Sequence, residues 1–258
     1  MSDKETNFIG HLTELRQRLI NSLIFLIILF AICYYFSDYI YGFLVEPYAS
    51  AVKNDEVERR LIFTALQETF MTYIKVSFFA AFFATSPFIL IQFWKFIAPG
   101  LYKHEKKAIM PYLFLTPVLF LLGGMLVYYL IMPLAIKFFL SFESAGLNTN
   151  LPIQLEAKVN EYLSLVMKLI FAFGLSFQLP VILSLLARIG AVDTKFLRER
   201  RKYVVVIIFA VAAILTPPDP ITQFGLGIPL LLLYELSILS VSIIESKNLK
   251  RKREEENA

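Results

Sequence analysis

The 258-residue sequence is poor in charged residues, which make up 18% of it, and poor in residues that hold metals or form disulfides. Soluble domains usually carry about a quarter charged residues and roughly 45–50% apolar ones, whereas 57% of this chain is hydrophobic. The shortage of charge excludes a disordered chain and an ordinary soluble enzyme, and it favours a membrane protein. A single cysteine, Cys33, cannot form an intrachain disulfide, and two histidines, His11 and His104, are too few to predict a metal site.

The sequence also lacks the common enzyme motifs. It contains no Gly-x-x-x-x-Gly-Lys phosphate-binding loop, no His-Glu-x-x-His zinc motif and no Gly-x-Ser-x-Gly nucleophile motif. We therefore expect no cofactor and no enzymatic activity. Any work that the protein does must draw on a partner or on the membrane potential.

What the sequence does have is long apolar runs. A helix that crosses about 30 Å of hydrocarbon needs about 20 residues, and we predict an all-α membrane protein with six transmembrane helices, the two C-terminal spans being short. The whole chain, 1–258, is predicted to be one integral membrane domain with a charged tail at 245–258. The predicted spans are 19–36, 70–93, 111–132, 161–187, 203–216 and 224–244.

Two local features refine this prediction. The N-terminal segment is amphipathic and should lie in the membrane interface before the chain turns into the first span; its apolar residues are Phe8, Ile9, Leu12, Leu15 and Leu19. We also expect prolines to break three of the spans, at Pro87, Pro117 and Pro180.

The basic residues predict the orientation of the spans. Six spans place both termini on one side of the membrane, and that side carries 18 of the 25 lysines and arginines, against five on the other side. Because cytoplasmic loops are enriched in lysine and arginine, both termini are predicted to be cytoplasmic. The positive net charge is therefore a sign of topology rather than of nucleic-acid binding. The basic tail fits either contact with anionic membrane lipids or anchoring of the last helix.

Two carboxylates stand out on this basic face. Glu14 lies in the segment His11–Arg16, and Glu105 lies in the segment Pro99–Glu105. Glu14 could simply pair with Arg18 one helical turn away, and Glu105 could balance neighbouring lysines. Alternatively, both could accept guanidinium groups from a ligand, which carboxylates bind with a two-pronged geometry that lysine cannot match.

Polar residues within the apolar spans allow a second function. Such residues are costly in a membrane and are often functional; here they are Gln178, Glu235 and Gln92. Gln178 fits an interhelical hydrogen bond or a polar path, and the three together could line the midplane site of a small-solute or ion transporter. Asp219 follows two prolines and could cap the helix after it.

Short segments along nearly the whole chain carry a resemblance to a known family. They are His11–Arg16, Pro47 in the predicted first outer loop, Phe93–Glu105, Phe173–Pro180 and Leu215–Asp219. In this order, and with six spans, they make the chain resemble the TatC family, the multi-span subunits of the twin-arginine protein translocase.

The resemblance implies a concave helical bundle in the bacterial cytoplasmic (inner) membrane that recognises twin-arginine signal peptides of folded precursors. It also implies single-span TatA- and TatB-type partners, self-association in a receptor complex, and export driven by the proton motive force.

The resemblance further implies roles for individual residues. Those implied in signal-peptide binding are Glu14, Glu105, Arg16, Phe96 and Lys103. Those implied in intramembrane polar or partner contacts are Gln178, Pro47, Phe70, Asp219 and Gln223, and we place Glu235, a polar residue of the last span, in the same set. Relatives often carry a glutamate at the position of Gln178, and the amide found here cannot titrate.

Overall fold

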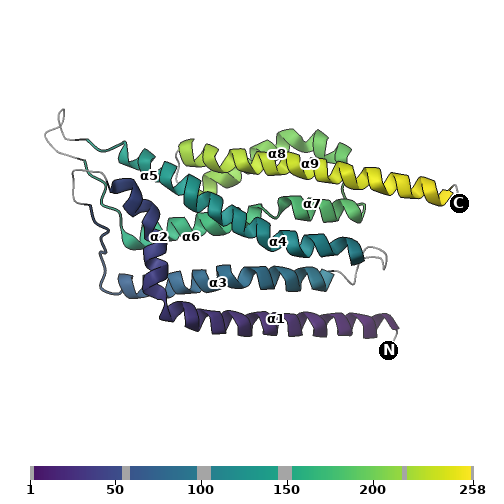
Figure 1. Cartoon of the computed structure of the whole chain (residues 1–258), viewed down its shortest axis with the longest axis horizontal. Coiled ribbons are helices and arrows are strands. Elements are labelled where there is room, and N and C mark those ends of the chain that lie inside the picture. Colours follow the sequence, from purple (N-terminus) through teal and green to yellow (C-terminus); the bar gives the residue numbers. More distant parts are fainter. Residues whose placement is uncertain (1–2, 54–58, 98–105, 145–152, 217–219, 257–258) are drawn as a thin grey trace. The chain divides into compact units, whose positions relative to one another are not determined.

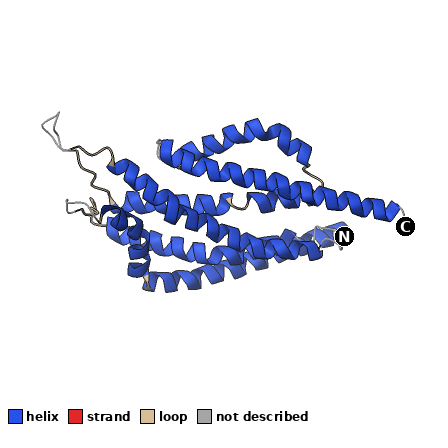
Figure 2. Ribbon diagram, turned by 45° about the horizontal axis from the view of Figure 1, so that its top comes forward, coloured by secondary structure: helices blue, strands red, loops and turns tan. Residues whose placement is uncertain are grey.

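The computed structural model describes residues 3–53, 59–97, 106–144, 153–216 and 220–256 (Figures 1 and 2). Within these ranges the chain is helical, and its β interactions are two isolated bridges, Ile62 with Lys158 and Ser144 with Ile153. The all-α prediction is thereby confirmed. The helices are α1 (Asp3–Tyr35), α2 (Ser37–Val52), α3 (Glu68–Ile97), α4 (Lys106–Leu126), the π-helix η3 (Val127–Ile131), α5 (Met132–Leu140), α6 (Val159–Ser176), α7 (Leu179–Arg188), α8 (Thr194–Leu215) and α9 (Pro220–Glu256).

Five segments of the described chain are long and apolar enough to cross a membrane. They are Leu12–Tyr35, Glu68–Phe93, Phe114–Leu140, Val159–Arg188 and Thr222–Lys247. These correspond to five of the six predicted spans. The predicted span 203–216 forms the second half of α8, whose first half is strongly charged. The prediction of a short last span is wrong, because the apolar part of α9 extends over 26 residues.

The predicted turn between the N-terminal segment and the first span is also absent. α1 is a single helix of 33 residues, and its membrane-compatible part begins at Leu12 rather than Leu19. No glycine or proline interrupts the sequence between His11 and Tyr35, so nothing stops the helix from continuing. Glu14 and Arg18 therefore lie on the same helix as the first span.

The prolines behave differently from one another. Pro87 and Pro117 lie inside the uninterrupted helices α3 and α4, so the predicted breaks there are wrong. Membrane helices tolerate proline where neighbouring groups satisfy the freed backbone. Pro180 does mark a break, because α6 ends at Ser176 and the proline occupies the first turn of α7, where its missing N–H needs no partner. The sequence did not predict the π-helix η3.

One compact unit comprises Met1–Glu46, Leu61–Val118 and Lys158–Leu163. In it, α1 packs along α3 in antiparallel fashion (Figure 1). Phe25 lies against Phe88 and Phe30 against Phe78, with ring centroids 5.0 and 6.3 Å apart. The antiparallel register brings the N-terminal part of α1 to the C-terminal part of α3, and this is where the candidate site lies.

The second unit comprises Pro47–Arg60, Leu119–Ala157 and Ser164–Ala258. Its long helix α9 packs against α7, α8, α5 and η3. Helices α4 and α6 meet through glycines: a Cβ atom on Gly123 would lie 2.7 Å from the carbonyl oxygen of Phe173, and one on Gly174 would lie 2.7 Å from the ring of Phe120. Small residues let membrane helices approach closely, so these glycines fix the contact.

Candidate functional site

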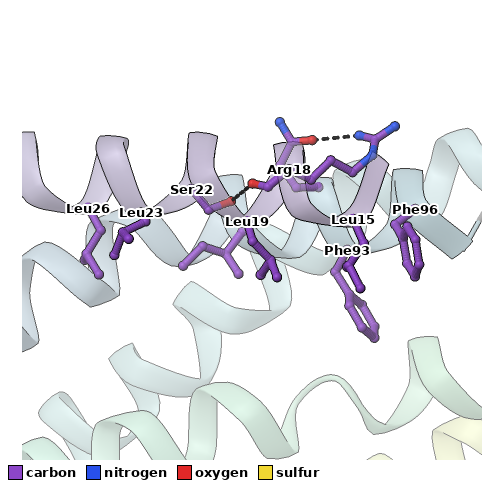
Figure 3. A pocket seen from close by; sticks show the side chains of 10 residues that line it. Leu15, Arg18, Leu19, Ser22, Leu23, Leu26, Phe93 and Phe96 are labelled. Atoms are coloured by element: carbon purple, nitrogen blue, oxygen red, sulfur yellow. Dashed lines mark hydrogen bonds between the residues drawn. The ribbon is translucent and has the colours of Figure 1, made fainter. Parts of the chain in front are cut away.

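The polar cluster of the first unit centres on Arg18. Its guanidinium donates to Glu14 Oε1 from Nη2 at 2.5 Å and from Nε at 3.1 Å. A third donor, Nη1, reaches Gln92 Oε1 at 2.7 Å (Figure 3). Glu14 lies one turn before Arg18 on α1, whereas Gln92 comes from α3. The side chains of Arg18 and Glu14 are 24% and 37% exposed, so the cluster remains accessible from outside the helix pair.

An apolar cavity of about 250 Å³ lies beside this cluster, between α1 and α3. Apart from Arg18, Gln92 and Ser22, its lining is apolar and consists of Leu15, Leu19, Leu23, Leu26, Ile89, Phe93 and Phe96. In Figure 3 the labelled leucine and phenylalanine side chains point away from the Arg18–Gln92 hydrogen bond. The helix pair thus offers polar acceptors next to an apolar hollow.

The structure brings part of the predicted signal-peptide site together. Phe96 lines the cavity with Leu15 and Arg18, and Arg16 is exposed on α1. Glu105 and Lys103 lie outside the described residues. The predicted Glu14–Arg18 pair is present. The sequence did not show that Arg18 also binds Gln92, because these residues lie 74 positions apart and meet only through the α1–α3 register.

Gln178 is deeply buried, with 2% of its surface exposed. It lies in the turn between α6 and α7, where its side-chain nitrogen donates to the Gly174 carbonyl at 3.4 Å. Glu235 on α9 pairs with Arg201 on α8, with 2.7 Å between Oε2 and Nη2. Gln92 and Glu235 each contact an arginine of their own unit, an arrangement that does not favour the transporter alternative.

The other residues implied in polar or partner contacts lie on different helices where the structure describes them. Pro47 is buried inside α2 rather than in a loop, which corrects the sequence-based placement. Phe70 is exposed near the start of α3. Gln223 on α9 donates to the Phe209 carbonyl on α8 at 3.3 Å. Asp219 lies outside the described residues.

An ion pair that the sequence did not predict links the segment before α3 to the end of α5. Arg59 binds Glu143 through two parallel hydrogen bonds of 2.6 Å, and the Leu155 N–H donates to Glu143 Oε1 at 2.6 Å. The side chains of Arg59 and Glu143 are only 7% and 21% exposed. The hydrogen bonds from Arg59 hold the pKa of Glu143 below its ordinary value.

Comparisons with known proteins agree with the fold and the motifs. The family model described as "Sec-independent protein translocase protein (TatC)" matches residues 10–229. The chain is 50% identical over 240 residues to the TatC protein of Rickettsia prowazekii, covering 93% of this chain and 94% of that protein. It is 48% identical over 254 residues to the TatC protein of Magnetococcus marinus, covering 98% and 90% of the two chains.

A crystal structure of the twin-arginine translocase receptor TatC superposes with a TM-score of 0.76 at 40% identity, covering 91% of this chain and 99% of that one. The family match extends over most of the chain and includes α3 and the part of α1 from residue 10 on, which carry the Glu14–Arg18–Gln92 cluster. The chain belongs to the TatC family of Sec-independent protein translocase proteins.

Proposed function

We propose that this protein is the receptor subunit of a twin-arginine translocase and binds the signal peptides of folded precursors. The observation that carries the proposal is Glu14, a carboxylate that already holds a guanidinium fork at the α1–α3 pair. With single-span TatA- and TatB-type partners, and after self-association in a receptor complex, it drives export by means of the proton motive force. The similarity to a solved twin-arginine translocase receptor supports this assignment.

The proposed site combines residues inside and outside the described chain. Glu14, Arg16 and Phe96 form it together with Glu105 and Lys103. The surrounding surface is basic, so a peptide with two arginines needs these local carboxylates to bind there. Pro47, Phe70, Gln178, Asp219, Gln223 and Glu235 are proposed to serve polar or partner contacts within and around the membrane.

We place the protein in the bacterial inner membrane as one integral domain with six spans and cytoplasmic termini. Five apolar segments and the distribution of basic residues support this topology. In this proposal the remaining span is the apolar second half of α8, 203–216, which at helical rise is about 21 Å long and therefore short for a bilayer.

The proposal is tested with a photoreactive amino acid placed at position 13 or 104, next to Glu14 and Glu105 so that both carboxylates remain, and a precursor that carries a twin-arginine signal peptide. We expect crosslinks from both positions, and a large loss of crosslinking when both arginines become lysines, because lysine lacks the fork. Glu105→Gln should reduce crosslinking from position 13 and leave membrane insertion intact. Equal crosslinking of the lysine peptide would overturn the proposed recognition, and loss of Glu105→Gln from the membrane would assign Glu105 a structural role.

A further inference from the structure

We propose that Glu14 and Gln92 together form the subsite for one arginine of the signal peptide, and that Arg18 occupies this subsite until the peptide displaces it. The inference rests on the proposed function, since it names how the same site is filled without ligand. It adds Gln92 as a ligand-binding residue and gives Arg18 the role of an internal competitor.

The first support is the shape of the acceptor pair. A guanidinium carries its N–H donors in a rigid planar fork. Arg18 uses three of them, with Nε and Nη2 on Glu14 and Nη1 on Gln92, at distances between 2.5 and 3.1 Å. A lysine ammonium is a compact point charge and cannot reproduce this planar contact. The subsite is therefore built for arginine, whichever chain supplies it.

The second support is that exchange costs little at this position. The Glu14–Arg18 pair lies one helical turn apart and is partly exposed, and such pairs contribute little to helix stability. A ligand arginine would make the same hydrogen bonds that Arg18 gives up. Addition without exchange would instead place two positive groups at one carboxylate, where they repel each other.

The third support is the cavity beside the cluster. Its apolar lining includes Leu15, Leu19 and Phe96, so it can accommodate the aliphatic part of an incoming arginine next to the polar acceptors. Arg18 can leave the subsite without unfolding of α1, because its side chain is already 24% exposed. Exchange therefore requires only side-chain rotation.

Competition has a thermodynamic signature. The apparent affinity for a ligand is the intrinsic affinity multiplied by the fraction of molecules in which the site is free. Removing Arg18 frees the site and should therefore raise the apparent affinity. Removing Gln92 weakens the bound peptide and the bound Arg18 alike. These two effects should nearly cancel while Arg18 is present, and the loss of a peptide contact should appear only when Arg18 is absent.

The test measures binding of a fluorescent twin-arginine signal peptide to the full chain in lipid nanodiscs. We expect Arg18→Met to raise the affinity about three- to tenfold, as for one charge-assisted contact. Gln92→Met alone should change the affinity by less than about twofold. In the Arg18→Met background, Gln92→Met should lower the affinity about three- to tenfold. Arg18→Lys keeps the charge and should also raise the affinity, by a smaller factor.

The controls separate the alternatives. Gln92→Met leaves the net charge unchanged. If its effect on affinity depends on Arg18, that dependence therefore cannot come from a loss of repulsion between Arg18 and the peptide. A lower affinity in both Arg18→Met and Arg18→Lys would show that Arg18 merely supports Glu14 and would overturn the inference. An equal effect of Gln92→Met in both backgrounds would overturn it as well. If the unmodified chain and the variants all fail to distinguish the twin-arginine peptide from its twin-lysine form, the proposed function itself fails.

Discussion

At the scale of single residues, arginine side chains hydrogen-bond to carboxylates in both units of the described chain. Arg18 holds Glu14, Arg59 holds Glu143 and Arg201 holds Glu235. Charges removed from water need partners of this kind, yet the three pairs differ in exposure. The partly exposed Arg18 pair is suited to exchange with a ligand, whereas the nearly buried Arg59 pair is suited to holding two segments together.

The Arg59–Glu143 pair should make stability depend on pH in the acid range. Its hydrogen bonds lower the pKa of Glu143 in the folded protein. The stabilisation is therefore fully present above the ordinary glutamate pKa of about 4.3 and is lost as the pH falls through the lower folded value. Thermal unfolding in detergent between pH 7 and pH 3 should show this loss, and Glu143→Gln should show a smaller pH-dependent change from this source.

At neutral pH, Glu143→Gln should lower the free energy of unfolding by roughly 1.5–3 kcal/mol, because it deprives the buried Arg59 guanidinium of its charged acceptor. The matched control is Glu156→Gln. Glu156 pairs with Arg60 at 3.8 Å and both side chains are exposed, so the cost should stay below about 1 kcal/mol. Equal effects of the two substitutions would show that the Arg59 pair is not a structural link.

At the scale of helices, α4 and α6 approach closely through glycines. A Cβ atom on Gly123 would meet backbone of α6, which cannot rotate away, whereas one on Gly174 would meet the ring of Phe120. Gly123→Ala should therefore destabilise the protein by roughly 1–3 kcal/mol. Gly42→Ala is the control, because nothing lies within 4 Å of its Cβ position in α2 and alanine favours a helix. Thermal unfolding of both variants measures the difference, and equal behaviour would contradict the proposed contact.

The positions of the helices were largely predictable, since a long apolar run is a local property of the sequence. The continuity of α3 through Pro87 was not, because it depends on how neighbouring groups satisfy the freed backbone. The same limit applies to the site. Glu14 stands out as a carboxylate in a basic segment, but Gln92 and Arg59 acquire partners 74 and 84 positions away. Only the three-dimensional register reveals such contacts.

At the scale of the whole molecule, the orientation of the chain depends on α8. Its first half carries Lys195, Arg198, Arg200, Arg201 and Lys202, and its second half is apolar. Positive residues resist translocation, so the segment before α8 should stay in the cytoplasm while the apolar half enters the membrane. If α8 crosses, the tail returns to the cytoplasm; if it does not, α9 carries the tail outside.

Cysteine labelling distinguishes the two topologies. After Cys33→Ala, single cysteines replace Lys53, Ala191 or Ala258, and intact cells whose outer face is accessible are treated with a membrane-impermeant maleimide. We expect labelling at position 53 without permeabilisation, and labelling at positions 191 and 258 only after it. Position 191, exposed between α7 and α8, reports on the first four spans, and position 258 reports on α8 and α9. Labelling of position 258 from outside, with position 191 protected, would mean that one of these helices does not cross and that the chain has five spans.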